Sequence, residues 1–152
     1  MALDVKKLRR FIGLMAWWPP YLGTGLTVDK VNETATSYQV SMKLRFYNRN
    51  IYGSHFGGSL YSMCDPWYAF AASAYFGDGY IIWDKSASIK YLSPGKGKVT
   101  GLFEIPVEQL AAMKAEVDAT GKKTYTFVTD ITDQKQTVVA EVTKEIYIRK
   151  KQ

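Results

Sequence analysis

The residues that could perform chemistry gather in one stretch, which reads Asn-Ile-Tyr-Gly-Ser-His-Phe-Gly-Gly-Ser-Leu-Tyr-Ser-Met-Cys-Asp from Asn50 to Asp65. The pair Gly57-Gly58 opens an apolar segment that we expect to be helical. Glycines let a ligand approach the unpaired N–H groups at a helix start, and these groups can polarise a carbonyl or hold an anion. Asp65 follows about two turns later, and a carboxylate in an apolar helix is costly to bury unless it is paired or used in chemistry. The combination suggests acyl chemistry.

The cysteine and histidine content restricts this chemistry. Cys64 is the only cysteine and His55 the only histidine, which excludes an intrachain disulfide, a cysteine-rich zinc site and a multi-histidine metal centre. The two could form a nucleophile pair, but a cysteine on a buried helical face more commonly serves packing. We therefore expect no metal and no resident cofactor. The chemistry available is a carboxylate, polarising amides and water.

The net charge of +6 suggests either a solvated basic surface or a site for a phosphorylated carrier such as coenzyme A. Basic residues cluster near the two ends and around Lys96 and Lys98 without forming a stripe. No nucleic-acid-binding motif accompanies them, so we expect no nucleic-acid partner.

The start of the chain resembles a signal peptide only superficially. Basic residues from Lys6 to Arg10 precede an apolar run from Phe11 to Trp18. That run is short, ends in Trp-Trp-Pro-Pro and lacks a small-residue cleavage pattern. No apolar run approaches the roughly 18 residues that span a bilayer. The sequence predicts a cytoplasmic protein without a transmembrane segment.

Apolar residues at helical spacing predict an amphipathic first helix from about Leu3 to Ala16, which Pro19-Pro20 should stop. This helix is either packed on the domain, which we favour, or an anchor at a membrane surface. A second, central helix is expected from Gly57 to Phe76 and is apolar on nearly all sides, as a core helix is. Pro66 should kink it beside Asp65. Bulky residues on and near it could line an acyl pocket or fill the core: Trp67, Tyr68, Phe70 and Trp83.

The rest of the chain predicts strands. Apolar and polar residues alternate from Tyr38 to Phe46, as in a half-buried strand. A buried helix among about six mainly antiparallel strands indicates the α+β class, with a sheet curled around that helix. We expect one domain over residues 1–152, with residues 1–20 as a helical extension. The expected strands are Leu26–Asn32, Ser37–Tyr47, Trp83–Leu92, Lys98–Ile105, Tyr125–Ile131 and Val138–Ile148, with a short helix between Pro106 and Gly121.

From about Leu22 to Arg149 the chain resembles the hotdog fold, specifically the PaaI-like acyl-CoA thioesterases. The resemblance rests on Asn50, on Gly57-Gly58, and on Asp65 seven residues beyond Gly58. The segment Ala-Ser-Ile-Lys-Tyr-Leu-Ser-Pro that ends at Pro94 is similar to a family strand that ends in a proline turn. The sequence His-Phe-Gly-Gly is similar to that of a less characterised branch.

The resemblance implies a homodimer or homotetramer in which each site is shared between subunits. Asp65 would be the nucleophile or the general base that activates water, and the Gly57 amide would polarise the thioester carbonyl. Asn50, from the other subunit or the preceding loop, would position water or substrate. A thioester already has a good leaving group, so a base and an oxyanion site suffice.

Two departures from the family pattern concern further candidates. Many members place histidine directly before Gly-Gly, whereas Phe56 stands there and His55 precedes it. His55 is therefore either catalytic or structural. Asp84 stands where relatives often carry Ser or Thr. It could assist Asp65 or raise its pKa by repulsion, or it could be a solvated residue beside Lys85.

The function that follows is hydrolysis of an acyl-CoA or acyl-carrier thioester, with coenzyme A entering only as part of the substrate. The candidate substrate-binding residues are Phe56, Gly58, Lys90, Lys96 and Lys98, of which the lysines could contact phosphates or only water. The alternative is a non-catalytic acyl-CoA- or lipid-binding hotdog protein, because a fold alone does not guarantee activity. A hydratase or dehydratase acting on acyl thioesters is a third option, disfavoured by the displaced His55.

Overall fold

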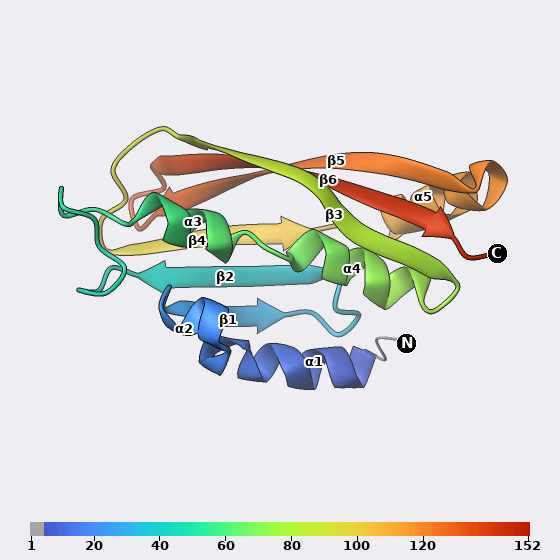
Figure 1. Cartoon of the computed structure of the whole chain (residues 1–152), viewed down its shortest axis with the longest axis horizontal. Coiled ribbons are helices and arrows are strands. Elements are labelled where there is room, and N and C mark those ends of the chain that lie inside the picture. Colours follow the sequence, from blue (N-terminus) through green and yellow to red (C-terminus); the bar gives the residue numbers. More distant parts are fainter. Residues whose placement is uncertain (1–4) are drawn as a thin grey trace.

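One antiparallel sheet of six strands organises the computed structural model, which describes residues 5–152 (Figure 1). The strand order is β1-β2-β4-β5-β6-β3, so β1 and β3 form the two edges. This confirms the predicted α+β class. The strands are β1 (Leu26–Val31), β2 (Ser37–Lys43), β3 (Tyr80–Tyr91), β4 (Lys98–Glu104), β5 (Lys122–Asp133) and β6 (Val138–Lys150).

The helices lie against this sheet in three places. In Figure 1, α3 and α4 cross in front of the sheet, the N-terminal helices lie beside β1, and α5 lies near the ends of β5 and β6. Their bounds are α1 (Val5–Leu14), the 3-10 turn η1 (Met15–Trp17), α2 (Pro19–Leu22), α3 (Gly57–Met63), α4 (Trp67–Phe76) and α5 (Val107–Thr120).

The predicted single central helix is wrong in one respect, because it is two helices. α3 ends at Met63 and α4 begins at Trp67, with Asp65 in the break and a cis peptide before Pro66. Proline offers no N–H to a helix and disfavours helical geometry in the residue before it. The break is therefore sharper than the predicted kink, and it places Asp65 outside regular helix.

The second strand ends earlier than predicted, at Lys43 rather than at Tyr47. The Asn48 side chain causes this, because its Nδ2 donates to the Lys43 carbonyl at 2.9 Å. Its Oδ1 accepts from the Arg45 N–H at 2.7 Å. These bonds turn the backbone away from the sheet, so the alternating pattern up to Phe46 continues beyond the strand.

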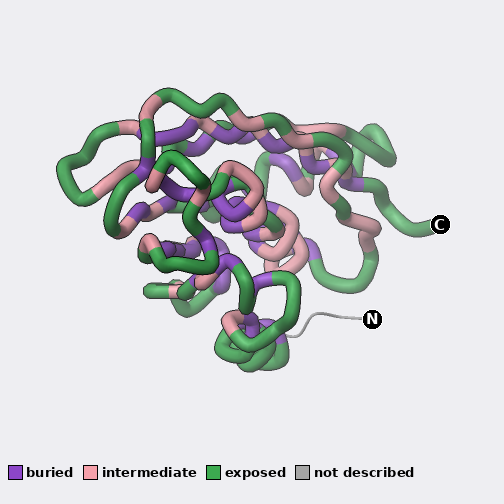
Figure 2. Tube along the Cα trace, turned by 60° about the vertical axis from the view of Figure 1, so that its left-hand side comes forward, coloured by how far each residue is buried: buried purple, intermediate pink, exposed green. Residues whose placement is uncertain are grey.

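The first helix packs on the domain, as favoured from its sequence. Leu8, Ile12 and Met15 are buried, and they join a core that lies between the sheet and the helices (Figure 2). The prediction was wrong at its end: α1 stops at Leu14, and Pro19 starts α2 at a position that proline favours. The predicted starting residue Leu3 lies outside the described residues.

Of the bulky residues that could line an acyl pocket or fill the core, Trp67 and Tyr68 fill the core. Trp67 is fully buried and contacts the Tyr38 ring at 5.4 Å, and Tyr68 stacks on Phe127 at 4.5 Å. Trp83 instead lies half exposed on β3.

Candidate active site

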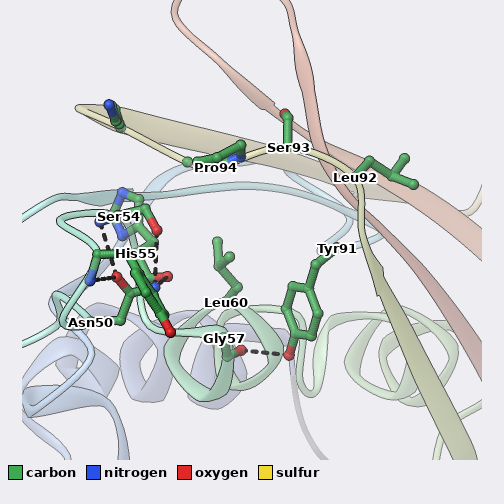
Figure 3. Close-up of a pocket in the computed structure, with 12 residues that line it drawn as sticks. Asn50, Ser54, His55, Gly57, Leu60, Tyr91, Leu92, Ser93 and Pro94 are labelled. Atoms are coloured by element: carbon green, nitrogen blue, oxygen red, sulfur yellow. Dashed lines mark hydrogen bonds between the residues drawn. The ribbon is translucent and has the colours of Figure 1, made fainter.

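A cavity of about 550 Å³ lies between the β2–α3 loop and the segment that follows β3 (Figure 3). We call it the loop pocket, and its walls include Asn50, Ser54, His55, Gly57, Leu60, Tyr91 and Lys96. Three predicted catalytic residues, Asn50, His55 and Gly57, therefore border one cavity.

The Asn50 side chain holds the loop in which it lies. Its Oδ1 accepts from the N–H groups of Tyr52 at 3.0 Å and Ser54 at 3.1 Å. Its Nδ2 donates to Ser54 Oγ at 2.9 Å and to the His55 carbonyl at 3.3 Å. The carboxamide thus shapes the wall of the loop pocket, and its bonds run to residues at most five positions away.

His55 is buried, with 3% of its surface exposed. Its Nε2 lies 3.0 Å from the Gly97 carbonyl and its backbone N–H donates to the Gly95 carbonyl. Burial lowers the pKa of its imidazole, and the bond to Gly97 only partly offsets this. A neutral ring that donates from Nε2 leaves Nδ1 as an acceptor, which is buried and has no hydrogen-bond partner among residues 5–152. His55 pins the loop to the turn before β4.

The Gly57-Gly58 pair starts α3, with aromatic rings close against it. The Tyr91 hydroxyl donates to the Gly57 carbonyl at 3.0 Å, as Figure 3 shows. A Cβ at Gly57 would lie 2.9 Å from the Tyr91 ring, and a Cβ at Gly58 would lie 2.5 Å from the half-exposed ring of Phe56. The glycines let the Tyr91 and Phe56 rings lie close to the backbone, so a larger residue at either position would displace one of these half-exposed rings.

The second group of charges lies at the other end of α3. Lys144 on β6 points its ammonium between two carboxylates, and we call Asp65, Asp84 and Lys144 the carboxylate cluster. Lys144 Nζ donates to Asp65 Oδ1 at 2.8 Å. It also lies 2.9 Å from the buried Asp84 Oδ1, at ion-pair distance but without hydrogen-bond geometry. Lys144 therefore directs its hydrogen bond to Asp65 and only its charge to Asp84.

Exposure differs sharply within the carboxylate cluster. The Lys144 side chain is 4% exposed, that of Asp84 26% and that of Asp65 54%. Burial raises the pKa of the Asp84 carboxyl, which Lys144 only partly counteracts. Burial alone would lower the pKa of Lys144, but its contacts with Asp65 and Asp84 outweigh that effect and raise it. Lys144 is therefore a permanent cation at neutral pH.

A cavity of about 390 Å³ opens beside the carboxylate cluster, and the N-terminal segment forms part of its wall. The Tyr21 hydroxyl on α2 donates to the Asp65 carbonyl at 2.8 Å. Burial raises the pKa of Tyr21, and the nearby Asp65 and Asp84 charges raise it further, so it stays a neutral donor. The lining residues are Trp18, Pro20, Tyr21, Tyr61, Ser62, Asp65 and Lys144.

The three lysines predicted to bind phosphate lie in different surroundings. Lys90 is exposed and pairs with Glu141 at 2.8 Å, and Lys98 pairs with Asp29 at 2.8 Å. Lys96 is the predicted phosphate-binding lysine that lines the loop pocket. Cys64 is buried and donates to the Leu60 carbonyl, and burial raises the pKa of its thiol to about 12. A thiol held protonated in this way is a poor nucleophile.

Sequence reasoning missed Lys144 and Tyr21, although the strand pattern contained a signal for Lys144. On β6 the inward positions alternate as Val142, Lys144, Ile146 and Ile148, and all four are buried. A lysine in register with an apolar face needs a buried partner. Tyr21 has no comparable signal, because its contact with Asp65 spans 44 positions.

Among residues 5–152, no group of three or more His, Cys, Asp or Glu side chains could hold a metal ion. Over the same range, no helix has the length and apolar character needed to cross a membrane.

Comparison with solved structures places this architecture in a known class. A protein of unknown function from Pseudomonas aeruginosa, described as a probable thioesterase, shares 20% identity over 99% of both chains with a TM-score of 0.78. A thioesterase from Haemophilus influenzae is 13% identical, over 99% of this chain and 93% of that one, with a TM-score of 0.68. The Escherichia coli PaaI protein from the phenylacetic acid degradation operon is 20% identical, over 99% and 96%, with a TM-score of 0.65. The chain therefore has the hotdog fold of the PaaI-like thioesterases, as its sequence predicted.

The family model gives the narrower assignment. The chain belongs to the family described as a domain of unknown function, DUF4442, whose model matches residues 8–148. No curated protein matches the sequence.

Proposed function

We propose that this protein hydrolyses acyl thioesters, of coenzyme A or of an acyl carrier, with Asp65 as base or nucleophile. The observation that carries the proposal is the Asp65 carboxylate, half exposed beside a cavity in a fold that named thioesterases share. Asp65 either takes a proton from the attacking water or attacks the carbonyl itself. The carbon–sulfur bond then breaks and the thiolate leaves, which yields an acid and a thiol after hydrolysis.

The two halves of the proposed site lie at opposite ends of α3. Seven helical residues at about 1.5 Å each put roughly 10 Å between the Gly57 end and Asp65. A carbonyl polarised by the Gly57 amide must lie about 3 Å from it, which is out of reach of Asp65 in the same chain. A homodimer resolves this if the loop pocket of one subunit faces the carboxylate cluster of its partner.

In such a dimer the loop pocket would take the carbonyl and the carrier. The Gly57 amide would contact the reacting group, with its sequence neighbours Phe56 and Gly58 beside it, and Lys96 would meet the carrier phosphates. Asn50 would act by shaping the loop in which its carboxamide is engaged. His55 would act through the loop that it pins and not on substrate. The reaction needs neither a metal nor a cofactor, and the cytoplasm, where such thioesters are made and used, is its proposed location.

Mixed dimers test both the reaction and the shared site. Thiol release is measured on short, medium, long and aryl acyl-CoAs with the wild type, Asp65→Asn, and Gly57→Val, whose side chain would clash with Tyr91. We expect Asp65→Asn to lose about 10²- to 10⁴-fold in kcat, the range for removal of a general base. Gly57→Val should also lose activity, because its side chain displaces Tyr91 and fills the space beside the Gly57 amide. Co-expressed with separate tags and purified as a mixed dimer, the two variants should regain activity at one of two sites.

The outcomes are distinct. Hydrolysis that Asp65→Asn leaves unchanged would refute the role of Asp65. Loss in both variants without recovery in the mixed dimer would keep the reaction but place both halves in one chain. No thiol release by the wild type would refute the proposed hydrolysis.

A second candidate function is binding of an acyl thioester without hydrolysis. The pairing of Asp65 with Lys144 favours it, because the Asp65 oxygen that accepts the hydrogen bond from the Lys144 ammonium at 2.8 Å is engaged and not free to meet a water or a carbonyl. This candidate predicts saturable, ligand-dependent thermal stabilisation by an acyl-CoA with no release of thiol.

A further inference from the structure

Lys144 is a buried charged group to which the proposed reaction assigns no role. A lysine with 4% of its side chain exposed needs compensation for lost hydration, and the structure supplies two carboxylates rather than one. These come from separate parts of the chain, Asp65 from the α3–α4 break and Asp84 from β3. Asp65 and Lys144 line the cavity beside the cluster, whereas Asp84 Oδ1 lies buried behind them, 2.9 Å from the same ammonium.

The remaining titratable groups around Lys144 are neutral. Tyr21 from α2 and Cys64 from the end of α3 both face the cluster, and burial raises the pKa of each. Lys144 is thus the sole positive charge that the structure records against Asp65 and Asp84.

We propose that Lys144 is a positioning residue, which fixes the Asp65 carboxylate through Oδ1 and supplies the charge that lets Asp65 and Asp84 lie side by side. This inference rests on the proposed function. Lys144 restrains the side chain, and the Tyr21 hydroxyl restrains the Asp65 backbone at its carbonyl. The Asp65 carboxylate is thereby held through Oδ1 while its side chain remains half exposed and lines the cavity. Lys144 itself, as a permanent cation, neither attacks substrate nor accepts its proton.

The test uses Lys144→Met, which removes the charge but keeps much of the chain length, and Lys144→Arg, which restores the charge. On the best thioester of the panel, we expect Lys144→Met to lower kcat about 10- to 100-fold with KM little changed, the scale of a misplaced reacting group. The acid limb of the pH profile of kcat should move to higher pH in Lys144→Met, because two neighbouring carboxylates without the ammonium between them bind a proton more readily. Lys144→Arg should restore most of the kcat and return the acid limb toward its wild-type position.

A second readout needs no activity. In protein labelled with ¹³C at the Asp carboxyl carbons, with Asp84→Asn used for assignment, the Asp84 titration midpoint should rise in Lys144→Met and return in Lys144→Arg. A merely structural Lys144 would change stability and leave the pH profile in place. Unchanged kcat and an unmoved acid limb in folded Lys144→Met overturn the positioning role.

Two further results keep the test decisive. If Lys144→Met does not fold, Asp84→Asn replaces it: with one carboxylate per ammonium, the acid limb should move to lower pH, and an unmoved limb overturns the proposal. If the wild type hydrolyses no thioester, the proposed function fails and the catalytic meaning of Lys144 falls with it. The Asp84 midpoint then still decides whether Lys144 balances the two carboxylates.

Discussion

The loop pocket and the carboxylate cluster lie at opposite ends of α3 and are stabilised in opposite ways. In the loop pocket, Asn50 binds groups within five positions of itself, and the bonds are between neutral groups. In the carboxylate cluster, Lys144 meets Asp65 across 79 positions, and the contacts are between charges. The Asn50 network can form as its loop forms, and only the His55 contact with the turn before β4 is distant in sequence. The carboxylate cluster exists only once β3, β6 and the α3–α4 break have come together.

This difference predicts unequal costs of removing one group from each region. The largest loss of stability is expected for Lys144→Met, which leaves Asp65 and Asp84 without the ammonium that both contact. Removal of one partner from a buried ion pair costs 3–5 kcal/mol, and we expect about 3 kcal/mol because Asp65 is half exposed and can be hydrated. Urea denaturation followed by circular dichroism measures the loss of unfolding free energy.

The matched control is Lys90→Met, which breaks an ion pair of the same 2.8 Å length on the surface and should leave the urea midpoint essentially unchanged. Adding Asp84→Asn to Lys144→Met should recover part of the loss, because a neutral amide replaces a stranded charge. Equal losses from Lys144→Met and Lys90→Met would show that burial does not separate the two pairs.

A smaller effect is expected for Asn50→Ala in the loop pocket. The change leaves the N–H groups of Tyr52 and Ser54 without their acceptor, but water reaches part of the loop. We expect a loss of about 1–2 kcal/mol. Hydrogen exchange should show faster exchange confined to the loop between β2 and α3.

Asn50→Asp is the conservative companion of that change. It keeps an acceptor for Tyr52 and Ser54 and loses only the donor to Ser54 and His55, so it should cost less than Asn50→Ala. Faster exchange spread over the whole sheet in either variant would contradict the local character of the loop pocket.

The smallest effect concerns pH. Because burial lowers the pKa of His55 below its unfolded value of about 6.5, the unfolded chain binds the proton first as pH falls. The contribution of His55 to stability is therefore full above pH 6.5 and is lost as pH falls through the lowered pKa. Thermal unfolding between pH 7.5 and 5 should show a slight decline that His55→Gln removes. An identical decline in His55→Gln would assign it to other groups.

The fold was predictable because its signals are local and repeated. Alternation on β5 and β6 and the apolar stripe from Leu60 to Tyr75 each require burial of one face, and together they permit few arrangements. The errors lie where one side chain or one ring overrides a pattern: Asn48 ends β2 at Lys43, and Pro66 divides the central helix.

The candidate site was predictable only in part. Asn50 holds the stretch up to His55 by local hydrogen bonds, so residues close in sequence border one cavity, but the anchoring of His55 to Gly95 and Gly97 spans about 40 positions and had no signal in the sequence. Asp84 was left open between a solvated residue and a neighbour of Asp65, and the structure places it in the carboxylate cluster. Nothing near Asp84 in the sequence decides between these two positions for its side chain, because the residue that Asp84 contacts, Lys144, is 60 positions away.

By itself, the sequence determined the class of fold, the glycine pair that opens α3 and the position of Asp65 beside a proline that disturbs the helix, although the full break was not predicted. These depend on backbone preferences and on periodic burial, which act over a few residues. Only the tertiary structure decided what Asp65 contacts. Strand pairing between β3 and β6 brings Asp84 close to Lys144. The break before α4 places Asp65 within 2.8 Å of the same ammonium. Charges interact through space whatever their separation along the chain, so such a cluster is fixed by the fold as a whole.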